Sequence, residues 1–74
     1  MSADIRIKAD EARRLKADSA FSTFVQKVRD DQIMVFTTSE ASDVEAREAA
    51  HGIIRALNQI ETKLDAAITA ETFL

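Results

Sequence analysis

The sequence predicts an all-α chain, an antiparallel hairpin of two helices with a short N-terminal helical arm. Apolar residues recur at helical spacing over most of the 74 residues, the chain has no Pro and one Gly, and capping residues precede two of the predicted helices. A chain of this length forms one domain, residues 1–74, with a small core. No Cys is present, so disulfides cannot add stability.

The C-terminal half contains the clearest pattern and predicts a long helix over residues 43–70. Ser42 followed three residues later by Glu45 forms a capping box at its start. At 1.5 Å per residue this helix spans about 42 Å, which favours an elongated hairpin or bundle. Its apolar residues alternate at spacings of three and four, and this seam, the line of core-facing residues, comprises Ala50, Ile53, Leu57, Ile60, Leu64 and Ala67.

A second helix is predicted over residues 19–37, where Asp31 or Gln32 interrupts an apolar line at helical spacing. The seam that holds the fold is expected at Phe21, Phe24 and Val28, and the same line also contains Val25 and Val35. Residues 37–42 are rich in Thr and Ser, which favour turns and caps, so they form the hairpin connection. One alternative stays open: residues 33–38 have high β-propensity and can form a short strand, although the chain offers that strand no obvious pairing partner.

The first seventeen residues have a separate apolar face. Nine residues separate Ala12, on this face, from Phe21, which amounts to about 900° of rotation, so the two apolar faces point in opposite directions on one straight helix. Asp18 and Ser19 lie at the phase change and are good N-caps. We therefore expect a break there and a short arm helix over residues 1–17 that packs separately.

Charge is unevenly distributed along the chain. The net charge is −3, of which residues 1–37 carry +1 and residues 38–74 carry −4. The basic residues of the arm are candidate nucleic-acid contacts, but interspersed acids and the lack of aromatic residues argue against that function. We prefer pairing with the acidic C-terminal helix, in the same chain or across an interface. The basic residues are Arg6, Lys8, Arg13, Arg14 and Lys16.

Few residues suit catalysis or metal binding. The one His, His51, follows Glu48 at the Glu-x-x-His spacing of helical di-iron sites, but both fall on the outer polar face of the predicted helix. The adjacent carboxylates Glu61 and Asp65 are common on exposed helices. We therefore expect no enzyme, no metal and no cofactor.

The long helix has more apolar surface than one partner helix covers. Small residues, Ala49, Gly52 and Ala56, flank the seam and allow a second helix to approach closely. Ordering 74 residues costs on the order of 110 kcal/mol, which one hairpin barely offsets. We therefore expect a homo-oligomeric helical bundle, with partner contacts at Ile54, Ile68, Phe73 and Leu74.

The layout resembles a group of short uncharacterised helical proteins encoded among the head and packaging genes of tailed phages and prophages. The similarity lies in four segments: DSAF (18–21), EARE (45–48), IRAL (54–57) and LDAAI (64–68). It implies an accessory protein of phage assembly or of the virion, without catalytic residues. The alternatives are an inhibitor of a host defence protein or nucleotide signal, or a nucleic-acid-binding packaging accessory. We expect the host cytoplasm or the virion, since no signal peptide or membrane span is predicted.

Overall fold

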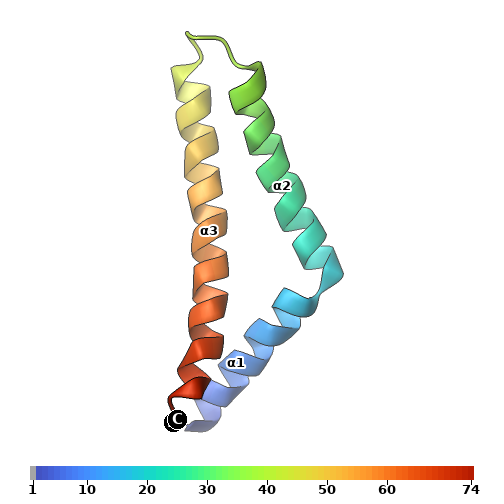
Figure 1. Ribbon diagram of the computed structural model, residues 1–74, viewed down its shortest axis with the longest axis vertical. Coiled ribbons are helices and arrows are strands. Elements are labelled where there is room, and N and C mark those ends of the chain that lie inside the picture. Colours follow the sequence, from blue (N-terminus) through green and yellow to red (C-terminus); the bar gives the residue numbers. More distant parts are fainter. Residues whose placement is uncertain (1) are drawn as a thin grey trace.

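The computed structural model describes residues 2–74, which form three helices: α1 (Ser2–Ala17), α2 (Ser19–Thr38) and α3 (Val44–Thr72) (Figure 1). Because these residues contain no strand, the all-α class is confirmed, and the strand alternative for residues 33–38 is wrong. The predicted ranges differ from these helices by at most two residues, and residue 1 of the predicted arm lies outside the described part.

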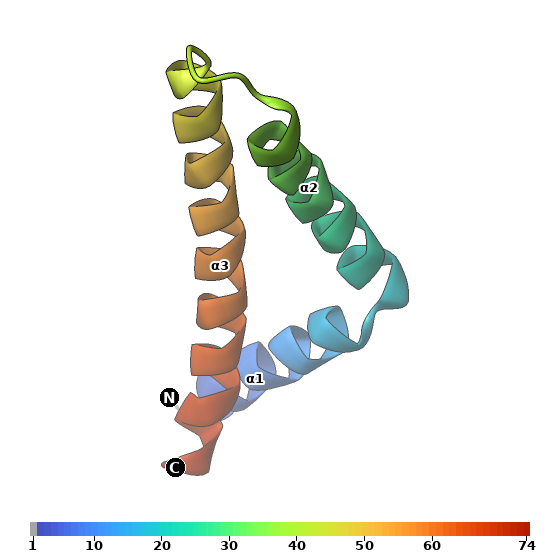
Figure 2. The same cartoon turned by 45° about the horizontal axis from the view of Figure 1, so that its top comes forward.

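Asp18 alone separates α1 from α2. Its backbone is extended, with φ −71° and ψ 114°, and its carboxylate accepts a hydrogen bond from the backbone N–H of Phe21 at 2.9 Å. An extended residue interrupts the helical path, so the chain bends between the two helices (Figures 1 and 2). The chain therefore changes direction at the predicted phase change.

The connection between α2 and α3 is held by Asp43 and Arg47. The Asp43 carboxylate accepts a hydrogen bond from the N–H of Glu40 at 2.9 Å, and the Arg47 guanidinium donates to the carbonyls of Glu40 and Ala41. The predicted capping box is wrong: Asp43, not Ser42, is the N-cap of α3 and makes no side-chain cap bond. The tight turn draws its carboxylate back toward Glu40 instead.

The long helix α3 is the central element of the fold. α2 packs against its N-terminal half and α1 against its C-terminal half, and both contact α3 more than they contact each other (Figure 1). The described chain measures 52 × 21 × 13 Å and has a radius of gyration of 16.2 Å, compared with about 11 Å for a compact domain of this length. The fold is therefore long and thin.

The buried core consists of three small residues, Ala9, Ala12 and Ala50, at 0%, 4% and 1% exposure. Larger apolar side chains are half-buried or exposed. The accessible surface is 5603 Å², whereas a compact monomer of 8.2 kDa exposes about 4,500 Å². The three helices therefore leave unusually much surface uncovered.

The seam predicted for α3 is correct at some positions and wrong at others. Leu57 and Leu64 are half-buried, as expected of seam residues. In contrast, Ile53 is 41% exposed and Ile60 is 44% exposed. Ala50 is buried and Ala67 is half-buried, so two of the six predicted seam residues of α3 lie at the edge of the packed surface.

Two residues predicted as exposed partner contacts on α3, Ile54 and Ile68, are half-buried within the chain. Successive helical residues differ by about 100°, so 53 and 54 cannot both face one neighbour. The apolar stripe of α3 is wider than α2 covers, and α2 lies over the edge where Arg29 reaches Asn58 and Glu61. That contact explains why Ile54 is half-buried, whereas Ile68 lies in the half of α3 against which α1 packs.

The seam of α2 differs in the same way. Phe21 is half-buried, but Phe24 is 65% exposed and Val28 is 38% exposed. The half-buried line of α2 runs through Phe21, Val25, Arg29, Gln32 and Val35. Val25 and Val35 were expected at helical spacing, but the polar residues Arg29 and Gln32 were not expected in the packed line.

Candidate functional site

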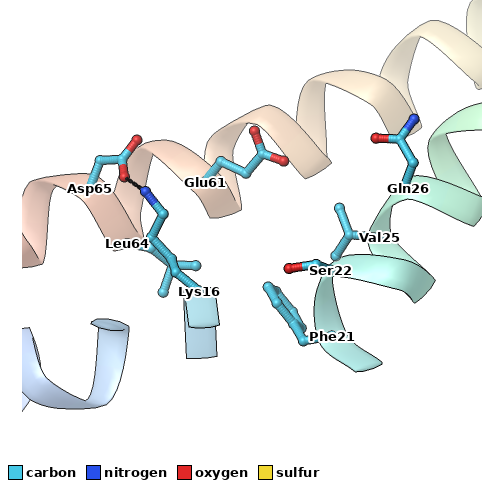
Figure 3. Close-up of a pocket in the computed structure, with 8 residues that line it drawn as sticks. All are labelled: Lys16, Phe21, Ser22, Val25, Gln26, Glu61, Leu64 and Asp65. Atoms are coloured by element: carbon cyan, nitrogen blue, oxygen red, sulfur yellow. Dashed lines mark hydrogen bonds and ion pairs between the residues drawn. The ribbon is translucent and has the colours of Figure 1, made fainter. Parts of the chain in front are cut away.

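A cavity of about 220 Å³ lies where α1 and α2 diverge beside α3 (Figure 3). Phe21, Val25 and Leu64 supply its apolar wall, and the polar groups around it are Lys16, Ser22, Gln26, Glu61 and Asp65. Pockets for small molecules typically measure about 300–1,000 Å³. A space this small suits an apolar side chain of a partner better than a cofactor.

Ion pairs connect α1 to α3. Arg13 Nη2 donates to Glu71 Oε1 at 2.6 Å, and Arg13 Nη1 donates to Asp10 Oδ1 at 2.9 Å. Lys16 pairs with Asp65 beside the cavity (Figure 3). The basic arm and the acidic C-terminal half therefore meet within one chain, and the pairs help to hold α1 along α3.

Two of the five candidate nucleic-acid contacts are thus engaged in ion pairs. Arg6, Lys8 and Arg14 are exposed, and none of them has a carboxylate within 4.0 Å among the described side chains. These three residues follow one another around α1 at wide angles and do not form one compact basic patch. Within the described chain, the arm therefore contacts α3 through Arg13 and Lys16.

The Arg13–Glu71 pair shifts the pKa of both partners. The hydrogen bond from Arg13 lowers the pKa of the Glu71 carboxyl below its ordinary value, and the charge of Arg13 acts in the same direction. The hydrogen bond to Glu71 likewise raises the pKa of Arg13. Arg13 therefore stays charged at every pH of interest, and Glu71 is the group that titrates.

Acid is expected to weaken the packing of α1 on α3. Because the pKa of Glu71 is lower in the folded chain than in the unfolded chain, its contribution to stability is complete above the unfolded value. That contribution disappears as the pH falls through the folded pKa. An NMR titration should place the Glu71 carboxyl below the ordinary glutamate range, and amide exchange in α1 should rise over the same interval.

The Glu71→Gln variant is the control for this acid effect. It keeps the size of the side chain but has no titrating carboxyl, so the exchange of α1 amides should lose this part of its pH dependence. A Glu71 carboxyl that titrates at or above the ordinary range would contradict the ion pair as a stabilising contact.

A polar cluster interrupts the contact between α2 and α3. The Arg29 side chain is only 19% exposed, and its guanidinium donates to Asn58 Oδ1 at 2.8 Å and to Glu61 Oε1 at 2.9 Å. Asn58 and Glu61 lie three residues apart on one side of α3, so one planar guanidinium reaches both. The cluster fixes which residues of α2 and α3 lie at the same level.

Exposed apolar side chains are the most prominent feature of the molecular surface. Phe24, Val28, Ile53 and Ile60, named here the Phe24–Ile60 face, were all predicted as seam residues, and all are exposed. Beyond α3, Phe73 is 82% exposed and Leu74 is 51% exposed, so these two residues of the predicted partner set remain accessible. The sequence identified these residues as apolar, but their spacing alone could not separate core residues from exposed ones.

Glu48 and His51 are both exposed on α3. Within residues 2–74, no group of three or more His, Asp or Glu side chains is placed to hold a metal ion. None of the helices in this part of the chain combines the length and apolar character needed to cross a bilayer.

Comparison of the chain with protein-family models, with curated proteins and with solved structures found no match.

Proposed function

We propose that this chain is a non-enzymatic helical interaction module that acts through contacts with its own copies and with a partner protein. One observation supports the proposal most directly: among the described side chains only three alanines are buried, while large apolar side chains such as Phe24, Ile60 and Phe73 are exposed. Burying apolar surface is the main favourable term in protein association. A chain with this distribution gains stability by binding.

The surface area supports the same proposal. The accessible surface of the chain is 5603 Å², whereas a compact monomer of this mass exposes about 4,500 Å². The difference is about 1,100 Å². One partner in a standard protein interface buries about 800 Å². The excess is therefore large enough for an interface of ordinary size.

The biological setting that we propose is phage particle assembly, with the chain as an accessory or a minor virion component. It rests on the resemblance of the four segments to small proteins encoded among head and packaging genes. An inhibitor of a host defence protein or nucleotide signal would use the same surfaces. The ion pairs of Arg13 and Lys16 weigh against the nucleic-acid-binding alternative, because they occupy two of its five basic residues.

The test is the absolute mass of the purified chain by light scattering on a sizing column, at low and high salt. We expect a defined oligomer of the 8.2 kDa chain, insensitive to salt and without absorbance near 260 nm from bound nucleotide. A stable monomer at every concentration would refute self-association. A nucleotide signal, or a nucleic-acid complex that dissociates with salt, would favour the alternatives.

Removing Phe73 and Leu74 tests the partner contact. Because these side chains are 82% and 51% exposed, their deletion should leave far-UV circular dichroism and the melting temperature unchanged. It should reduce the amount of the chain that co-purifies with assembled particles. If the deletion unfolds the chain, the two residues belong to its core, and they are not a free contact surface.

A further inference from the structure

We propose that the Phe24–Ile60 face is the surface on which a second copy of this chain docks, in a two-fold symmetric dimer. The inference rests on the proposed function and deepens it, since it assigns self-association to one side of the α2–α3 pair.

The four residues of the face point to one side of the α2–α3 layer. Each comes one position before a residue that takes part in the contact between the two helices. Moving back by one residue along an α-helix rotates the side-chain direction by about 100°. Because α2 and α3 are both right-handed and run antiparallel, this rotation points the side chains of both helices toward the same side of the layer. The four neighbouring pairs are Phe24/Val25, Val28/Arg29, Ile53/Ile54 and Ile60/Glu61.

The antiparallel packing of α2 and α3 also brings these residues to similar positions along the helix axes. Arg29 lies opposite Asn58 and Glu61, and in an antiparallel pair each step back along α2 corresponds to a step forward along α3. Val28 therefore lies level with Ile60, and Phe24 lies about one turn away, near Leu64. The exposed apolar residues are neighbours across the helix pair.

Small residues on α3 adjoin this apolar cluster. Ala49 and Ala56 each lie four residues before Ile53 and Ile60, so they share that side of the helix. Gly52 lies next to them, and a side chain built on it would have nothing within 4 Å. Nothing within the chain requires a glycine at this position, but a second backbone approaching the face would.

The opposite side of the α2–α3 layer combines polar and apolar residues. The residues one position after the packed ones include Ser22, Gln26 and Asp65, but also Ile33 and Phe36, which are 47% and 42% exposed. The apolar residues of that side lie on α2 alone, whereas those of the Phe24–Ile60 face come from both helices.

The face is suited to its own copy in particular. Bulky residues (Phe24, Ile60) and small ones (Ala56, Gly52) lie together on it, so a two-fold axis can bring the bulky part of one copy against the small part of the other. The rim carries charges of both signs, Lys27, Asp31 and Lys63, each three residues beyond a face residue. In a two-fold arrangement the acid of one copy can meet a base of the other.

The experiment compares dimer dissociation for variants of equal chemistry on the two sides of α2. Phe24→Glu places a charge on the face, and Ile33→Glu places the same charge at another exposed apolar position, 47% exposed and about 180° around the helix from Phe24. Phe24→Glu should weaken self-association by at least about 30-fold, the size of an interface hot spot. Ile33→Glu should leave it unchanged. Light scattering or sedimentation over a concentration series measures both.

Phe24→Ala and Ile60→Glu complete the set. Phe24→Ala adds no charge and should also weaken the dimer, and Ile60→Glu tests the α3 side of the face. Each variant is checked for helicity by circular dichroism. A variant that loses its helicity as a monomer would make the residue part of the fold and would overturn the assignment.

The outcomes separate this inference from the proposed function. If the natural chain self-associates and the face variants do so equally well, the face is not the interface, while the interaction module stands. If the natural chain is a monomer at every concentration, self-association itself fails.

Discussion

We expect the Leu57→Asp variant to lose most of the helical circular dichroism of the natural chain. Leu57 is half-buried on the side of α3 that faces α2, between Ile54 and Leu64 along the seam. Removing a side chain of this kind costs about 1–2 kcal/mol of apolar burial, and the carboxylate also loses part of its hydration. With three buried alanines as its core, the chain has little stability in reserve. We therefore expect unfolding and not only a lower melting temperature.

The matched control is Gln59→Asp, two residues along the same helix. Gln59 is exposed, so this variant introduces the same side chain with the same helix propensity but leaves the packed surface intact. It should retain its helicity and lose well under 1 kcal/mol. Equal loss of helicity in both variants would mean that aspartate disrupts the isolated helix, and that Leu57 has no packing role.

The helix boundaries could be predicted because they depend on neighbouring residues. Asp18 caps α2 through a bond to the N–H of Phe21, and this short-range preference can be read from the sequence. The start of α3 was harder, because Asp43 and Ser42 are both capping residues. The choice between them depends on the turn, where Arg47 and Asp43 bond to the chain around Glu40.

The packed side of α3 could not be predicted from spacing. Apolar residues occupy both 53 and 54, and heptads that begin at Ala50 fit either choice. Arg29, a polar residue that spacing rules place outside, decides the orientation by reaching Asn58 and Glu61. Local spacing patterns do not reveal a contact between residues about thirty positions apart.

The exposed apolar face was likewise only partly predictable from the sequence. Apolar character identified Phe24 and Ile60 as residues that need burial, but it did not say which chain covers them. Their exposures of 65% and 44% show that this chain does not cover them fully. Charge asymmetry was more informative, since the basic arm and the acidic C-terminal half meet at the Arg13–Glu71 and Lys16–Asp65 pairs.

The Ala9→Leu variant is expected to force α1 away from α3. Ala9 is 0% exposed, so a larger side chain has no room unless the helices move apart. Overpacking of this kind costs about 1–3 kcal/mol, and each 1 kcal/mol lowers the melting temperature of a chain this small by about 4–8 °C. Amide exchange should rise in α1, because its ion pairs with α3 separate as well.

The control for Ala9→Leu is Ala3→Leu, at an exposed position of α1. Alanine and leucine differ little in helix propensity, so the control should melt close to the natural chain. Both variants are compared at one protein concentration, because self-association would otherwise change the melting temperature. If Ala9→Leu melts with the control, α1 does not depend on close contact with α3. The basic arm would then be free to bind elsewhere, which would return the nucleic-acid alternative to consideration.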